Sequence, residues 1–140
     1  MEGTAMSKKI ALYPGSFNPF HEGHLNIYNK ACKVFDEVYI GSYKHIRDFD
    51  PNGLIERHHD KVIYFNSTLP AFVDKLSRNG IEISAIVRGL RNGSDLQYEE
   101  NMLYWYEDLG LKIPVVYFIC DRGLSHISSS AIRELNKIKK

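Results

Sequence analysis

The sequence predicts a single-domain α/β protein in which helices cover both faces of an open parallel sheet. Its 140 residues are 44% hydrophobic, enough for one globular core and few for two. Short apolar runs alternate with amphipathic ones along the chain, which is the strand and helix order of a parallel sheet. We therefore expect one domain over residues 1–140. Residues 1–6 are expected to be disordered or vector-derived, with a natural start at Met6.

Apolar runs and helical spacing predict the first elements. KIALYPG predicts a buried strand over residues 9–13, closed by the Pro and Gly that follow. HLNIYNKACKV places most of its apolar residues on one helical face, so a helix is expected over 24–34. EVYIGSY predicts a second strand over 37–42. After a polar loop, LIERHHDKVIYFNSTLP predicts a helix over 54–70 that ends at its Pro.

The remaining elements continue the alternation. AFVDKLSR predicts a helix over 71–78, and IEISAIVRG an apolar strand that ends at Arg88. SDLQYEENMLYWYEDLG predicts a long amphipathic helix with Ser94 or Asp95 as its cap and Gly110 as its stop. IPVVYFIC predicts another buried strand, and SSSAIRELNKIKK a final basic helix capped by serine.

Charge and cysteine content argue against several classes of protein. Eighteen Lys and Arg against seventeen Asp and Glu give a formal charge of +1, so we expect no general attraction to nucleic acid or to a membrane. Cys32 and Cys120 stand in no metal-ligand spacing, which favours reduced, buried thiols over a disulfide or a zinc site. No apolar run reaches the roughly 18 residues that span a bilayer. We therefore expect a soluble, cytoplasmic protein.

The stretch YPGSFNPFHEGH, at the carboxyl end of the first predicted strand, combines features of an anion site. Ligands of open parallel sheets bind beyond such strand ends. Gly15 allows a tight turn, Ser16 offers a hydroxyl, and the next helix start offers free amides. His21 and His24, three residues apart, can point at one ligand, and two imidazole donors suit phosphoryl or nucleotidyl transfer. A metal clamp lacks further ligands in a recognisable spacing. A structural alternative stays open, in which His24 caps and packs the helix and His21 is exposed.

Two further clusters at strand ends offer contacts to anions. Arg88 and Arg91 flank Gly89 just before a helix start, which suits a polyanion, although an arginine pair on a loop is often simply solvated. Three hydroxyls open the final helix, where one can cap and the others can bind phosphate: Ser128, Ser129 and Ser130. Three anion sites at one sheet edge suit a nucleoside triphosphate and a phosphorylated acceptor.

GSFNPFHEGH and ISSSAIR resemble the two signature motifs of the HxGH nucleotidyltransferase superfamily, in the same order and about a hundred residues apart. With VRGLRNGSDLQYE, they resemble the bacterial phosphopantetheine adenylyltransferases, from about residue 9 to residue 133. The resemblance implies a Rossmann-like fold, usually assembled as a hexamer. It also implies transfer of AMP from ATP to 4'-phosphopantetheine with Mg2+, giving dephospho-coenzyme A and pyrophosphate without a covalent enzyme intermediate.

The resemblance also implies roles for individual residues. His24 would stabilise the pentacoordinate α-phosphate, and His21 would assist at the triphosphate. Ser16 would hold the phosphate of the acceptor or of ATP, while Arg88 and Tyr13 would bind the acceptor. The residues expected around ATP are Gly15, Ser16, Phe17, His24, Gly89, Arg91, Glu99, Ser128, Ser129 and Ser130.

Several positions depart from the family pattern. The family has a basic residue in the loop after the second strand, where an ungapped count places Asp48, so Lys44 or Arg47 is expected to substitute as a catalytic residue. Asn18 replaces the usual Asp, and His21 stands where these enzymes often have Thr. The acceptor therefore stays open. Nicotinate or nicotinamide mononucleotide, cytidylyl transfer to a phosphorylated alcohol, and a non-catalytic nucleotide-binding module are the alternatives.

Overall fold

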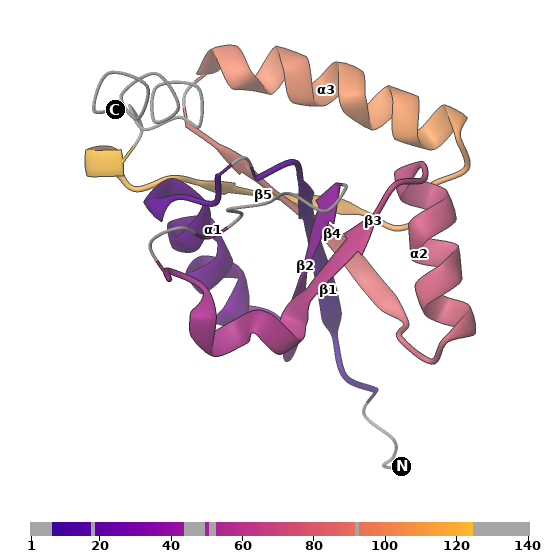
Figure 1. Cartoon of the computed structure of the whole chain (residues 1–140). Helices are drawn as coiled ribbons and strands as arrows, with labels where there is room; N and C mark the ends of the chain where they lie inside the picture. The colour runs from indigo at the N-terminus through magenta and orange to yellow at the C-terminus, as the bar shows by residue number, and fades with distance from the viewer. Residues whose placement is uncertain (1–6, 18, 44–49, 51–52, 92, 125–140) are drawn as a thin grey trace.

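The computed structural model contains one sheet of five parallel strands with helices on both faces, as predicted (Figure 1). It describes residues 7–17, 19–43, 50, 53–91 and 93–124. In chain order the elements are β1 (Ile10–Gly15), α1 (Glu22–Cys32), β2 (Glu37–Tyr43), the 3-10 helix η1 (Glu56–Lys61), β3 (Val62–Phe65), α2 (Leu69–Arg78), β4 (Ile83–Leu90), α3 (Gly93–Asp108), β5 (Val115–Ile119) and the 3-10 helix η2 (Arg122–Leu124).

The strand order β3-β2-β1-β4-β5 places β1 at the centre of the sheet. Successive strands are added on one side of β1 up to β3 and on its other side from β4 onward, so the strand order reverses between β1 and β4. β1 pairs with β2 as far as Gly15 opposite Ser42, but its pairing with β4 ends at Leu12 opposite Ile86. β1 and β4 therefore stop pairing with each other before their carboxyl ends. In open α/β sheets this switch point is where ligands bind.

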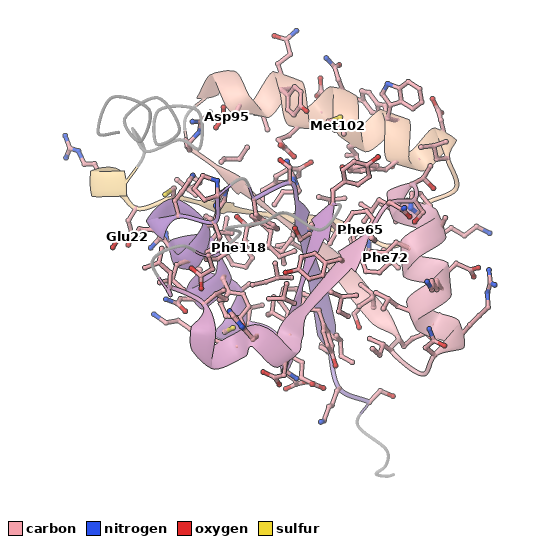
Figure 2. All side chains as sticks on the ribbon, in the orientation of Figure 1. Glu22, Phe65, Phe72, Asp95, Met102 and Phe118 are labelled. Atoms are coloured by element: carbon pink, nitrogen blue, oxygen red, sulfur yellow. The ribbon has the colours of Figure 1, made fainter. Side chains whose placement is uncertain are left out.

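Alternate residues of β1 build two cores, one on each face of the sheet. Ala11 and Tyr13 belong to a cluster with side chains of α1 and with Ile55. Leu12 belongs to a second cluster with α2, where Phe72 stacks on Phe65 at a ring-centroid distance of 4.4 Å (Figure 2). Burying a large apolar side chain such as Leu12 or Phe72 contributes about 1.5–3 kcal/mol, so both faces stabilise the sheet.

Capping signals fix the ends of α2 and α3. The Thr68 side chain accepts a hydrogen bond from the amide of Ala71, and Pro70 occupies the first turn, where no amide is needed. Gly80 and Gly110 follow the two helices with φ of 87° and 100°, which glycine adopts without a steric penalty. The predicted stop at Gly110 is confirmed.

The predicted helix over 54–70 is wrong. Asp50 accepts hydrogen bonds from the amides of Leu54 and Ile55, and the chain then forms the short η1 and the strand β3, which pairs with β2 at the sheet edge. The continuous apolar run of β3 has no period that separates a buried strand from a buried helix. The sheet thus has five strands where the sequence suggested four. The predicted helix over 128–140 lies outside the described residues.

Three local expectations were also wrong. α1 begins at Glu22 instead of His24, because the side chain of His21 caps its first turn. The helix ends at Cys32, two residues before the predicted end. α3 begins one residue before Ser94, so neither Ser94 nor Asp95 stands at the cap position. The two cysteines are free, but Cys32 is exposed rather than buried.

Candidate active site

A cavity of about 640 Å³ opens at the carboxyl edge of the sheet, at the switch point between β1 and β4. One part of its wall carries polar and charged groups from three segments: Ser16, His21, His24, Arg88 and Arg91. Another part is mostly apolar: Tyr43, Phe65, Leu69, Met102 and Tyr106. Met102 lies near the middle of α3 and Asp95 at its start (Figure 2). The cavity therefore joins an anion-binding region to an apolar one.

The two histidines cap the start of α1 reciprocally. Nδ1 of His21 accepts hydrogen bonds from the amides of Gly23 (3.0 Å) and His24 (3.4 Å), and Nδ1 of His24 accepts one from the amide of His21 (3.1 Å). Because backbone amides only donate, neither Nδ1 carries a proton, and each neutral ring has its proton on Nε2. The rings stack with centroids 3.7 Å apart, so both wall residues offer an Nε2–H donor from one place.

Both imidazoles are held neutral. Burial lowers the pKa of His24 well below its usual value, and His21, Arg88 and Arg91 add to the effect. Burial, followed by the charge of Arg91, lowers the pKa of His21 to about 4. Of the structural alternative, the capping and packing of His24 are confirmed, whereas the exposed His21 is wrong, since the His21 side chain also caps the helix and this residue is only 8% exposed.

Aromatic rings enclose His24. The centroids of Phe17, Phe20 and Tyr13 lie 4.8, 5.3 and 6.5 Å from that of His24. Phe17 has a φ of 46°, a left-handed conformation that costs a non-glycine residue about 1–3 kcal/mol and that its burial offsets. A Cβ on Gly15 would lie 3.0 Å from Cζ of Phe17, so the small Gly15 lets the chain pass close to this ring.

Arg88 is fixed in the cavity wall by three hydrogen bonds. Its Nε and Nη2 donate to the two carboxylate oxygens of Glu99 (3.0 and 2.8 Å), and its Nη1 donates to the carbonyl of Pro14 (2.8 Å). Burial opposes the charge on Arg88, but the hydrogen bonds and charge of Glu99 outweigh it, and the pKa of Arg88 is raised. Glu99 itself is buried and does not line the cavity.

Arg91 and Gly89 shape the wall next to Arg88. Arg91 is paired with Asp95 of α3 at 3.3 Å, and its side chain is 44% exposed, which places it at the rim. A Cβ on Gly89 would lie 2.7 Å from Cγ1 of Ile27, so β4 and α1 are in direct contact here. Gly89 therefore allows the helix that carries His24 to approach the strand that carries Arg88.

The structure brings most of the predicted site residues into one wall: Tyr13, Gly15, Ser16, Phe17, His21, His24, Arg88, Gly89 and Arg91. The predictions for Lys44, Arg47, Ser128, Ser129 and Ser130 concern residues outside the described ranges. The sequence interpretation missed the α3 side of the cavity. Tyr98, Met102 and Tyr106 line it at intervals of four, so a search for one helical face aimed at the sheet edge could have found them.

Comparison with known proteins agrees with this geometry. Residues 12–135 match the cytidylyltransferase-like family. The phosphopantetheine adenylyltransferase of Mycoplasma capricolum subsp. capricolum is 40% identical, over 94% of this chain and 99% of that protein. Those of Mycoplasma mycoides subsp. mycoides SC and Streptococcus pneumoniae (strain 70585) are 36% and 38% identical, over 94% of this chain and 99% and 86% of those proteins.

A solved structure shares the fold. The lipopolysaccharide core biosynthesis protein from Thermoplasma volcanium GSS1 superposes with a TM-score of 0.51 over 82% of this chain and 99% of that chain, at 15% identity. Such low identity speaks for the architecture alone, whereas the curated relatives match in sequence over nearly the whole length. The chain therefore belongs to the phosphopantetheine adenylyltransferase family, within the cytidylyltransferase-like nucleotidyltransferases.

Proposed function

We propose that this protein transfers the adenylyl group of ATP to 4'-phosphopantetheine, giving dephospho-coenzyme A and pyrophosphate. One observation carries the proposal beyond family membership: two neutral imidazoles with Nε2–H donors share a cavity with the fixed guanidinium of Arg88. These groups suit a reaction between two phosphate-bearing substrates, in which positioning and charge stabilisation supply most of the catalysis.

The reaction needs no general base from the protein. An oxygen of the acceptor phosphate attacks the α-phosphorus of ATP, the bond from that phosphorus to the bridging oxygen breaks, and pyrophosphate leaves with the bonding electrons. The second pKa of a phosphomonoester is about 6, so the attacking oxygen is already ionised near neutral pH. Neutral histidines are therefore suited to the role of hydrogen-bond donors, which is the role we assign to them.

The positions of the hydrogen-bond donors suggest which phosphate group each of them binds. We assign the α-phosphate to Nε2–H of His24 and the triphosphate chain to His21, with Ser16 beside them in the wall. Arg88 would bind the acceptor phosphate with the two N–H groups that Glu99 and Pro14 leave available. The apolar part of the wall would then receive the pantetheine arm. Arg91, at the rim, would contact ATP.

Magnesium enters this proposal as the counter-ion of ATP. Mg2+ prefers oxygen ligands, and the described residues contain no group of three or more His, Cys, Asp or Glu side chains that could hold a metal ion. The carboxylate of Glu99, which lies near the wall without lining the cavity, is bound through both oxygens to Arg88. These residues do not fit a protein-held magnesium site, and we assign no step of the reaction to one.

Assembly and location stay predictions. The family resemblance suggests a hexamer, and α3 has exposed apolar side chains, among them Trp105 at 63%, that a neighbouring subunit could cover. None of the described helices combines the length and apolar character needed to cross a bilayer. Sedimentation of the purified protein would measure the number of subunits.

Pyrophosphate release from ATP and Mg2+ tests the proposed reaction. The purified protein is offered 4'-phosphopantetheine, nicotinate mononucleotide, nicotinamide mononucleotide and glycerol 3-phosphate in parallel, with CTP as a second donor. We expect release with ATP and 4'-phosphopantetheine only. Release with another acceptor would replace the substrate and keep the reaction type, whereas no release with any pair would favour a non-catalytic nucleotide-binding module.

A further inference from the structure

We propose that Asn26 of α1 is a positioning residue for ATP: through Asp121 it holds the chain that leaves β5 against the helix that carries His24. The inference rests on the proposed function, because it takes the neighbouring wall of the cavity to bind ATP. Asn26 and Asp121 do not themselves line the cavity, so they act on ATP through the wall.

Asn26 and Asp121 are joined by two hydrogen bonds that run in opposite directions. Nδ2 of Asn26 donates to Oδ2 of Asp121 (2.8 Å), and Oδ1 of Asn26 accepts from the amide of Asp121 (2.9 Å). One turn further along α1, Nζ of Lys30 lies 2.8 Å from the other carboxylate oxygen of Asp121 and donates to the carbonyl of Ile119. A side-chain amide that both donates and accepts in this way fixes the position and the orientation of its partner.

These contacts lie where β5 ends. Of the described strands, β5 lies at one edge of the sheet, so it pairs only with β4. That pairing reaches Leu90 opposite Ile119, and the amide of Cys120 donates one further bond to the carbonyl of Leu90 (2.8 Å). The side chain of Asp121 is 61% exposed, so burial does not fix it. Its position therefore depends on the hydrogen bonds from α1, which the chain passes on its way to η2 (Figure 1).

The chain that α1 holds forms part of the cavity wall. Cys120, next to Asp121, lines the cavity and is 7% exposed. Burial raises the pKa of its thiol, whereas the charges of Lys30 and Arg91 act in the opposite direction, so both cations lie near it. Arg91 is the rim residue that we assign to ATP. Asn26 therefore positions the nucleotide side of the cavity.

The acceptor side of the cavity is held by other contacts. Arg88, which we assign to the acceptor phosphate, is fixed by Glu99 and by the carbonyl of Pro14. Neither partner belongs to α1 or to the chain beyond β5. Loss of the Asn26 contacts should therefore weaken the binding of ATP and leave that of the acceptor nearly unchanged.

Asn26→Ala is the direct test, because it removes both hydrogen bonds without changing the net charge. If the chain beyond β5 then occupies its binding position about a fifth of the time, a loss that two exposed hydrogen bonds allow, ATP should bind about fivefold more weakly. Calorimetry with ATP and Mg2+ measures this affinity. In turnover we expect the KM of ATP to rise about fivefold, while kcat and the KM of the acceptor stay within about twofold of wild type. Asn29→Ala is the matched control: it makes the same chemical change at an exposed position of the same helix and should alter none of these values.

An exchange of the two side chains tests the hydrogen bonds themselves. In Asn26→Asp/Asp121→Asn the new carboxylate still accepts from the backbone amide at position 121, and the new side-chain amide donates to its second oxygen. The new carboxylate also stands four residues before Lys30 on α1, where an ion pair is favourable. We expect this variant to bind ATP as wild type does. Wild type, Asn26→Ala and the exchange have the same net charge, so a change in net charge cannot produce this pattern. Urea unfolding midpoints show that each variant folds.

The outcomes separate this inference from the proposed function. Unchanged ATP affinity in Asn26→Ala would overturn the inference. So would an equal rise in the KM of both substrates, or an exchange variant that binds ATP as weakly as Asn26→Ala does. If wild-type protein bound ATP but released no pyrophosphate with any acceptor, the proposed function would fail, while weaker ATP binding by Asn26→Ala and its recovery in the exchange would still support the positioning role.

Discussion

Replacing His24 with Asn, Gln and Ala separates the functions of its two ring nitrogens. In the structure Nδ1 caps α1 by accepting the amide hydrogen of His21, and the proton on Nε2 is available to the cavity. The Oδ1 of Asn stands about where Nδ1 stood, so His24→Asn keeps the cap and loses the donor. The Nε2 of Gln stands about where the ring Nε2 stood, and Gln at the third helical position also offers an oxygen to the amide of the capping residue, so His24→Gln keeps a donor and an acceptor for the cap.

The expected magnitudes follow from these two contacts. Loss of one donor to a transition-state oxygen costs about 2.7–4 kcal/mol, so His24→Asn should lower kcat by at least ~100-fold. Loss of a helix cap costs about 1 kcal/mol of stability, so His24→Ala should unfold more easily than His24→Asn and His24→Gln, which both keep an acceptor for the amide of His21. Both variants remove the ring that packs on Phe17 and His21, so comparing the two cancels this shared loss.

Initial rates of pyrophosphate release and urea unfolding midpoints measure the two effects separately. The expected pattern is that His24→Asn and His24→Gln unfold at similar urea concentrations, while His24→Asn is the less active of the two. If His24→Asn kept a rate near that of wild type, Nε2 would not act in the transition state, and our assignment of His24 would be refuted. His24→Ala, which lacks both contacts, should combine the two losses.

Three other perturbations test the site. Arg88→Ala should raise the KM of the acceptor at least ~10-fold and that of ATP far less; an equal rise in both, in initial-rate measurements, would contradict our placement of the acceptor. The pKa of His21 falls from 6.5 to about 4 on folding, so the unfolded chain binds the extra proton and stability should fall as pH drops from 6.5 towards 4, by about 3 kcal/mol at most. Urea unfolding at several pH values should show a weaker dependence in His21→Asn. Gly89→Ala places a Cβ 2.7 Å from Ile27 and should cost about 1–3 kcal/mol. The added Cβ of Gly123→Ala has no atom of the described residues within 4 Å, so this control should leave the urea midpoint nearly unchanged.

Most of the fold could be predicted from the sequence, because the spacing of apolar residues and the positions of Gly and Pro indicated the same elements. Apolar runs located four of the five strands, and Gly110 ended α3 as expected. The strand β3 was missed because four consecutive apolar residues, Val62–Phe65, fit a buried helix as well as an edge strand. What decides between them is pairing with β2, a tertiary contact that no local pattern encodes.

The site was predicted as a set of residues but not as an arrangement. The spacing of His21 and His24 indicated a shared ligand, yet it did not indicate that His21 itself caps the helix, since His is not among the preferred capping residues. The pairing of Arg88 with Glu99 joins a strand to a helix eleven positions later. That register depends on how α3 lies over the sheet, which sequence spacing does not determine.

The place of the cavity in the chain has a consequence for synthesis. The strand β1 can pair with β2 once α1 has formed, but β4, which brings Arg88, follows only after β3 and α2. An unfinished chain can thus hold the histidine pair without the cation that faces it. A ligand that contacts both the histidine pair and Arg88 stabilises only chains in which β4 has already paired with β1. Substrate binding therefore favours chains in which β4 is already in place over shorter translation intermediates.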